Sequence, residues 1–206
     1  MNRIFCIVAL LVLTATGCKA QNKESVSVQW TPITEAAQTN IEENEKLFFV
    51  DFSTSWCGWC KKMDRETFSD PVVASILNKF YIPIHFDAEG NDEFTWLGTD
   101  YLPGKVVNGR PGTHSFTRAT LGTRIGYPSF AIFSPDMRLI QMFEGYRSSG
   151  EFSMILWYIC SMDYTRYTWE QYQDIFDTQI RPKMMKSIDW KAAADNADKP
   201  VQIYHE

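Results

Sequence analysis

Two cysteines separated by two residues carry the clearest chemistry in the sequence. Cys57 and Cys60 enclose a Gly-Trp dipeptide, and thiols at this spacing can cycle between a dithiol and a disulfide. Half of a zinc site and two incidental thiols are the alternatives. Zinc needs four ligands, and neither Cys160 nor any of the three histidines supplies a second paired spacing. We therefore favour the redox interpretation and expect no metal.

The surrounding pattern assigns the two thiols different roles. The apolar run Leu47–Ser53 predicts a buried strand and Lys61–Phe68 predicts a helix, so Cys57 lies at the junction between them. Unpaired backbone N–H groups and the helix dipole favour a thiolate at that position. We expect Cys57 to be the nucleophile and Cys60, on the first helical turn, to be the resolving thiol.

Asp51 is the candidate for the proton transfer that this chemistry requires. It is the one acid in the apolar strand and stands six residues before Cys57. A buried carboxylate with a raised pKa can accept the proton that Cys60 loses, directly or through water. The alternative is an exposed acid on an edge strand, and the flanking residues Phe49, Val50 and Phe52 argue against it.

Further strands are needed to hold this junction in place. Alternating or continuous apolar patterns predict strands over Tyr81–Phe86, Ser129–Phe133 and Leu139–Phe143, and a weaker pattern predicts one over Val26–Trp30. The turn residues Ser134-Pro135-Asp136 join two of them as a hairpin.

Helices alternate with these strands. Thr34–Glu45 predicts a helix, and Asp70 followed by Pro71 predicts the capped start of another. Ser148 and Glu151 predict a capping box at the start of a third. The fold class is therefore α/β, with a central mixed sheet of four to five strands flanked by helices.

Three motifs resemble those of the thioredoxin superfamily. They are Val50-Asp51-Phe52, the segment Trp56–Lys61 around the two cysteines, and Gly126-Tyr127-Pro128-Ser129. The resemblance covers roughly residues 26–160 and implies a thioredoxin-like fold in which Cys57 and Cys60 form the redox pair.

Two further segments resemble one group of proteins within this superfamily. Cys60–Met63 and Glu66–Pro71 are similar to the exported C-terminal domain of DsbD-type thiol:disulfide interchange proteins and related thioredoxin-like lipoproteins. The implied partners are protein dithiols and disulfides. The sequence has no flavin or nicotinamide fingerprint, so we expect no cofactor and a membrane-embedded dithiol protein as electron donor.

The resemblance also implies the residues that contact substrate. Pro128 would be cis and face the two cysteines, and the backbone of Tyr127 would pair with an extended substrate segment. Without the resemblance, Pro128 reads as a proline that begins a strand. Trp56 and Trp59 would flank the reactive sulfur as an apolar contact surface. Core packing is the alternative for both tryptophans, and it suits Trp56 better than Trp59.

The first 17 residues predict a secretory signal. Arg3 precedes an apolar run of 13 residues, Ile4–Thr16, which is shorter than a membrane-spanning helix. Small residues then lead into Cys18, and this arrangement resembles the lipobox of bacterial lipoproteins, in which the cysteine becomes acylated. An ordinary signal with a coincidental cysteine is the alternative. Lys19 resembles signals for transfer to the outer membrane, so we expect a lipid-anchored protein facing the periplasm.

The chain divides into a leader, a tether, one domain and an extension. We expect a signal peptide over 1–17, a tether over 18–28, a thioredoxin-like domain over 29–162 with an insertion at about 88–125, and a helical extension over 163–206. The insertion holds six of the eleven glycines. It reads equally well as a partner-docking loop and as a surface loop with its own small apolar cluster.

The extension contains one further amphipathic pattern. Thr168–Ile180 predicts a helix that Arg181-Pro182 ends. Cys160, just before the extension, lies beside an apolar helix face and is expected to be a buried, inert thiol.

Composition limits the function classes. The chain has 206 residues, 45% of them hydrophobic, and a net charge of −5 without a dense run of Lys and Arg, which argues against disorder and against nucleic acid as a partner. We expect a thiol–disulfide oxidoreductase that acts as a reductase. A disulfide oxidase or isomerase, and a non-enzymatic interaction module with this fold, are the alternatives.

Overall fold

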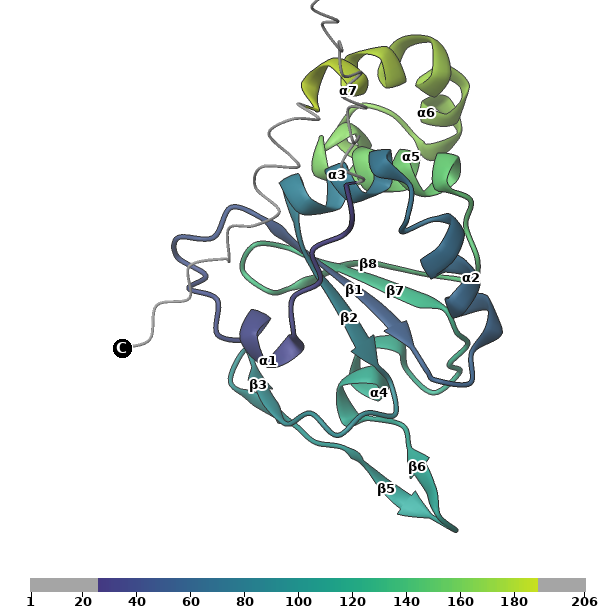
Figure 1. Ribbon diagram of the computed structural model, residues 1–206. Helices are drawn as coiled ribbons and strands as arrows, with labels where there is room; N and C mark the ends of the chain where they lie inside the picture. The colour runs from purple at the N-terminus through teal and green to yellow at the C-terminus, as the bar shows by residue number, and fades with distance from the viewer. Residues whose placement is uncertain (1–25, 189–206) are drawn as a thin grey trace, which may run out of the picture.

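A four-stranded mixed sheet forms the centre of the computed structural model, which describes residues 26–188. The strand order is β2-β1-β7-β8 (Figure 1). These strands are β1 (Leu47–Ser53), β2 (Tyr81–Asp87), β7 (Ser129–Phe133) and β8 (Leu139–Glu144). β1 pairs parallel with β2 and antiparallel with β7, and β7 forms a hairpin with β8. The expected α/β fold, with its central mixed sheet, is confirmed.

Helices cover one face of this sheet. They are α2 (Gly58–Glu66), α3 (Pro71–Phe80) and α5 (Ser149–Cys160). Between them and the sheet lies the first core, whose largest buried members are Phe49, Tyr81, Phe130, Phe152, Tyr172 and Phe176. Phe49 stacks on Phe130 of the neighbouring strand with ring centroids 5.8 Å apart. The strand that leads to Cys57 is therefore anchored at the middle of the molecule.

Part of the insertion covers the other face. It contributes β3 (Phe94–Trp96), β4 (Thr99–Tyr101) and α4 (Ser115–Leu121), and the short helix α1 (Ile33–Ala36) lies beside them. The second core on this face contains Phe48, Phe52, Phe86, Phe94, Trp96 and Phe116. A further hairpin, β5 (Gly104–Val107) with β6 (Arg110–Gly112), projects away from both cores (Figure 1). The apolar residues of the insertion thus pack against the sheet and do not form a separate cluster of their own, and the projecting hairpin lies outside this core.

Local capping explains where two helices begin. The Asp70 side chain accepts hydrogen bonds from the backbone N–H groups of Val72 and Val73, so the predicted cap is present. Ser148 accepts from the backbone N–H of Glu151, but the reciprocal bond of a capping box is not formed. The Glu151 carboxylate instead pairs with Arg147 at 3.2 Å, because the two side chains lie one helical turn apart.

The segment before β1 differs from its prediction. Val26–Trp30 is not a strand, and the predicted helix over Thr34–Glu45 is reduced to Ile33–Ala36. Pro83 in β2 explains the first difference, because a proline offers no N–H to a further strand. Its carbonyl still accepts one bond, from the Thr31 N–H at 2.7 Å.

The packed part of the chain starts earlier than expected. Val28 is buried in the first core and Val26 packs against it, so the last residues assigned to the tether belong to the folded domain. The predicted signal over 1–17 and the predicted acylation site at Cys18 lie outside the described residues. Within 26–188, no helix has the length and apolar character needed to cross a bilayer.

The extension forms a longer helical layer than predicted. It contains a short 3-10 turn, α6 (Trp169–Ile175), a π-helical turn (Phe176–Ile180) and α7 (Arg181–Ser187). Arg181-Pro182 therefore marks the start of α7 and does not end the helical layer. Pro182 is tolerated because it falls in the first turn of α7, where a missing N–H leaves no helical hydrogen bond unmade.

We predict that Met184→Ala destabilises the protein while Met185→Ala does not. Met184 is fully buried in the first core, whereas its neighbour is exposed. Removing the buried side chain should lower the free energy of unfolding by about 2–5 kcal/mol, and the exposed one should change it by less than about 0.5 kcal/mol. Urea denaturation measures both. Equal effects would mean that α7 is not part of the core.

Candidate functional site

The two cysteines lie where β1 gives way to α2. Cys57 is the N-cap of that helix, and its Sγ accepts a hydrogen bond from the backbone N–H of Cys60 at 3.0 Å. The two residues are joined by a disulfide, and both are buried. In the reduced protein the same N–H group and the helix dipole would stabilise negative charge on Cys57. The structure therefore gives Cys57 the setting expected of the nucleophile.

Two exposed tryptophans flank the buried disulfide. Trp56 is 65% exposed and Trp59 is 58% exposed, so core packing, the alternative that suited Trp56, is wrong. The reason is that both side chains lie beyond the end of the sheet, where neither core extends. The Trp56 indole donates to the Glu89 carboxylate at 2.9 Å, and its ring lies 5.9 Å from that of Tyr127.

Trp59 belongs to a second group of side chains at the same face. Its ring lies 5.7 Å from that of Tyr146. The Lys62 ammonium lies 4.5 Å from the centre of the Tyr146 ring, and the Tyr146 hydroxyl donates to Glu66 at 2.8 Å. These contacts hold Trp59 beside the start of α2 with one face open to solvent.

The loop before β7 brings Tyr127 and Pro128 to this face. The peptide bond between them is cis, Pro128 is buried and Tyr127 is half-buried. Burial raises the pKa of the Tyr127 phenol to about 12, so this group stays neutral at physiological pH. The contact between Tyr127 and Trp56 joins the loop to the residues that flank Cys57.

Asp51 lies on the face of the sheet that α2 covers. It is 1% exposed and stands on a central strand between β2 and β7, so the edge-strand alternative is wrong. Side chains alternate along a strand, and Phe49, two residues earlier, is in the first core beneath the helices. Asp51 therefore projects toward the same side as α2.

His85 is the partner of this carboxylate. The parallel register places it opposite Asp51, and its Nδ1 lies 2.9 Å from Asp51 Oδ2. Its Nε2 lies 3.2 Å from the Ser53 hydroxyl. The other carboxylate oxygen, Asp51 Oδ1, is buried and has no hydrogen-bond partner among the described residues. One oxygen of Asp51 thus remains open to accept a proton.

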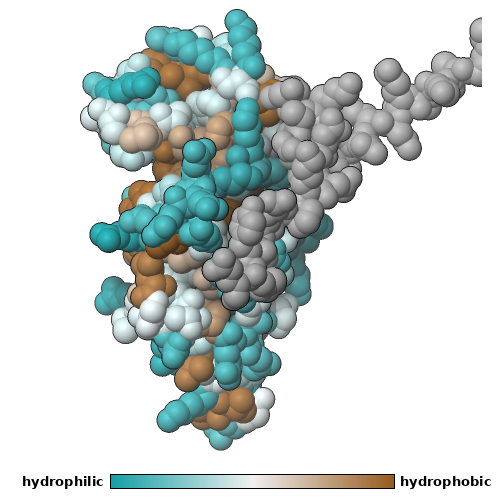
Figure 2. Space-filling model, turned by 90° about the vertical axis from the view of Figure 1, so that its left-hand side faces the viewer, coloured by the Kyte–Doolittle hydropathy of each residue, from teal (hydrophilic) through white to brown (hydrophobic). Residues whose placement is uncertain are grey.

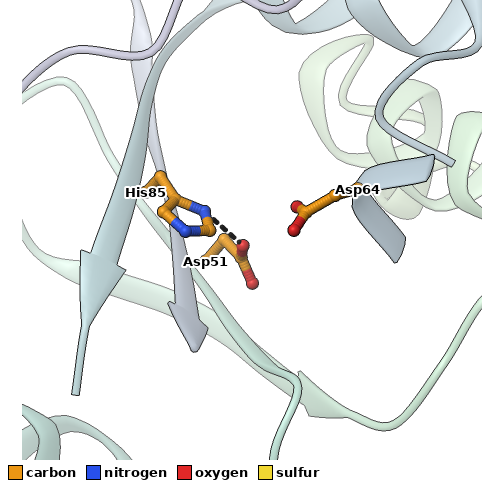
Figure 3. A group of neighbouring side chains, drawn as sticks. All are labelled: Asp51, Asp64 and His85. Carbon is orange, nitrogen blue, oxygen red and sulfur yellow. Dashed lines mark hydrogen bonds and ion pairs between the residues drawn. The ribbon is translucent and has the colours of Figure 1, made fainter. Parts of the chain in front are cut away.

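A third titratable group approaches this pair. Asp64 extends from α2 toward Asp51 and His85 (Figure 3), and one ligand atom from each of the three residues lies within 4.8 Å of the others. His85 already engages Asp51 through Nδ1, which favours proton transfer over metal binding at this group.

Burial and pairing shift the proton affinities of the cluster. Burial raises the pKa of Asp51, and the hydrogen bond from His85 opposes part of that rise. The same hydrogen bond raises the pKa of His85, against the effect of burial. Partial burial also raises the pKa of Asp64. All three groups therefore hold protons more tightly than in water.

His85 and Asp64 are site residues that the sequence analysis missed. His85 entered only as one of three histidines without zinc spacing. The sequence did contain a signal for His85. Asp51 is the fifth residue of the predicted strand Leu47–Ser53, and His85 is the fifth residue of the predicted strand Tyr81–Phe86. Two parallel strands joined by helices and started in register place such residues side by side.

Cys160 stands apart from this chemistry. It is a free thiol at the end of α5, and burial raises its pKa to about 12. A thiol that holds its proton this tightly is a poor nucleophile. Cys160 is thus half-buried and not fully buried as expected, and its raised pKa agrees with the expected inert role.

The fold and the site define a thioredoxin-fold protein with a CxxC redox pair. Residues 15–103 match the family model Thioredox_DsbH, described as a protein of unknown function, DUF255. This match covers less than half of the chain, and together with the order of the sheet it agrees with the expected resemblance to the thioredoxin superfamily. A fold of this kind with a close cysteine pair supports a thiol–disulfide redox role.

Individual relatives are distant. An uncharacterized protein of Caenorhabditis elegans is 32% identical over 113 residues, which are 55% of this chain and 13% of that protein. A putative disulphide-isomerase from Bacteroides thetaiotaomicron is 20% identical with a TM-score of 0.46, over 66% of this chain and 94% of that one. A structure titled DsbH Oxidoreductase is 12% identical with a TM-score of 0.47, over 67% and 88%. The chain thus spans only about an eighth of the worm protein.

We predict that Asp51→Asn stabilises the protein, and more so as the pH rises. The raised pKa of Asp51 means that the folded state holds its proton more tightly than the unfolded chain, so stability is lost as the pH rises through the folded value. The raised pKa of His85 acts in the same direction. Removing the buried charge should add about 1–3 kcal/mol at pH 8 and less at pH 5.

Urea denaturation at the two pH values measures this effect. Asp64→Asn is the matched control, because it removes a carboxylate of the same cluster from the exposed surface and should change stability by less than about 0.5 kcal/mol. A loss of stability in Asp51→Asn at pH 8 would contradict the argument.

Proposed function

We propose that the protein is a periplasm-facing thiol–disulfide oxidoreductase that reduces protein disulfides. The observation that carries the proposal is the position of Cys57, whose sulfur accepts an N–H bond at the start of α2, with Cys60 one turn further on. This arrangement favours a thiolate at Cys57 and keeps the second sulfur within bonding distance.

The reaction consists of two exchanges. The Cys57 thiolate attacks one sulfur of the substrate disulfide, forms a mixed disulfide and releases the other substrate sulfur as a thiolate. Cys60, once deprotonated, attacks the Cys57 sulfur and releases the second substrate thiolate. Two electrons pass to the substrate, and the Cys57–Cys60 disulfide seen in the structure is the product state.

The cluster of Asp51, His85 and Asp64 manages the proton of Cys60. Asp51 accepts it on the oxygen that lacks a partner, directly or through water. His85 fixes the orientation of the carboxylate through its hydrogen bond and balances the negative charge when protonated. His85 is exposed on one side, so the proton can pass from the buried carboxylate to solvent.

The flanking residues hold the substrate. Trp56 and Trp59 present apolar surface on either side of the disulfide, and the backbone of Tyr127, next to Pro128, pairs with an extended substrate segment. The amino-terminal pattern around Cys18 supports export and lipid anchoring, with the outer membrane favoured by Lys19. A membrane-embedded dithiol protein returns the electrons, since the mechanism uses no cofactor.

We predict distinct effects for the three cysteines of the domain. Cys57→Ala should abolish reduction of a model protein disulfide such as insulin, because no nucleophile remains. Cys60→Ala should form a mixed disulfide that persists, because nothing resolves it. Cys160→Ala is the control and should retain activity. Turbidity of reduced insulin and non-reducing gel electrophoresis report both effects.

The interaction-module alternative makes the opposite prediction. If Cys57→Ala leaves the cellular phenotype and partner binding of the wild-type protein intact, the oxidoreductase proposal is wrong and the fold serves only for binding.

The direction of electron flow is tested by a redox titration of the protein in defined thiol/disulfide buffers. The exposed Trp56 and Trp59 beside the disulfide provide a fluorescence signal. We expect a reversible two-electron transition near the thioredoxin value of about −270 mV, as suits a reductase. A transition near about −120 mV would identify an oxidant instead.

A further inference from the structure

A basic groove lies in the insertion, between the hairpin β5–β6 and the start of α4. Its volume is about 710 Å³. Lys105, Arg110 and Arg118 are its charged lining residues, and no carboxylate is among the residues that line it. All three cations are exposed, and none forms an ion pair within the described part of the chain.

This groove is a local exception in an acidic protein. The chain has 25 acidic residues in 206 and a net charge of −5. Residues 101–135 nevertheless contain no Asp or Glu, and they carry the three cations of the groove together with Arg124. The positive potential here is therefore not cancelled by neighbours in the sequence, and it would attract anionic groups selectively.

Exposed apolar side chains border the cations. Val106 is 68% exposed and Val107 is 64% exposed, both on β5. The hairpin projects from the lower end of the molecule, far from α6 and α7 (Figure 1). Figure 2 shows hydrophobic atoms beside hydrophilic ones at this lower end. A surface that combines valines with unpaired cations suits a polypeptide with both apolar and acidic side chains.

Arg118 connects the groove to the loop beside the disulfide. Arg118 lies on α4, which ends at Leu121, six residues before Tyr127. The charge of Arg118 acts on the Tyr127 phenol, whose pKa it lowers against the rise caused by burial. The Tyr127 ring in turn contacts Trp56, the residue before Cys57. A substrate bound at the disulfide thus has the groove within reach of its flanking segment.

We propose that this groove binds an acidic segment of the protein substrate next to the disulfide that is reduced. The inference rests on the proposed function and adds the class of substrate. Lys105, Arg110 and Arg118 pair with its carboxylates, and Val106 and Val107 contact its apolar side chains. Glu89 and Asp87 lie near Tyr127 and would repel such a segment there, so the attraction is assigned to the groove alone.

Three disulfide-linked peptides of equal length test the proposal. The residues beside their cysteines are acidic, neutral or basic, and the reduced full-length protein is mixed with each while tryptophan fluorescence is followed. At low ionic strength the acidic peptide should react about tenfold faster than the neutral one. The difference should vanish near 1 M salt, where the Debye length is about 3 Å.

Two charge-reversed variants separate the groove from general electrostatics. Lys105→Glu with Arg110→Glu should abolish the preference for the acidic peptide and leave the rate with the neutral peptide unchanged. Lys183→Glu with Lys186→Glu makes the same change in net charge on exposed positions of α7 and should preserve the preference. Equal rates for all peptides, or equal loss in both variants, would overturn the proposal.

Failure of the proposed function gives a different result. If none of the peptides is reduced, binding of a labelled acidic peptide with serine in place of cysteine is measured by fluorescence anisotropy. Binding that the groove variant loses would support the groove as a docking surface in a protein that is not a reductase. Absence of binding would overturn the groove as well.

Discussion

The pairing of β1 with β2 is the interaction on which the site depends. It holds the strand that leads to Cys57 in the middle of the sheet, between two aromatic cores. The same register sets Asp51 beside His85. One set of backbone hydrogen bonds therefore positions both the strand that leads to Cys57 and the pair of Asp51 and His85. A shift of one residue would turn the carboxylate to the other face of the sheet, away from α2 and from the cysteines that it is proposed to assist.

Burial of Asp51 determines how tightly its carboxyl group holds a proton. An aspartate in water holds its proton too weakly to take one from a thiol, whereas burial raises the pKa of Asp51 toward the range where exchange is possible. His85 limits that rise through its hydrogen bond and connects the buried acid to the surface. Asp51 is thus buried while the His85 side chain is partly exposed, an arrangement that suits the proposed transfer of a proton to solvent.

The sequence predicted the parts that depend on periodicity and on short-range capping. The four sheet strands, the Asp70 cap and the burial of Asp51 follow from local pattern, and each is present. Features decided by distant contacts were missed. Pro83 removes the hydrogen bond that a strand at Val26–Trp30 needed. The helical layer continues beyond Ile180 as α7, which buries Met184 in the core. The role of His85 required the register between two strands, and the exposure of Trp56 required knowledge of where the cores end.

Pro83 has a consequence for how the protein behaves among other proteins. An open sheet edge is a template on which a second chain can add a strand. At β2 the proline interrupts the row of donors, and the Thr31 N–H occupies the Pro83 carbonyl. Recruitment of another chain is therefore disfavoured along this side of the sheet. For a protein that acts on protein disulfides, as proposed, such an edge lowers the risk that a bound polypeptide remains attached as an extra strand at β2.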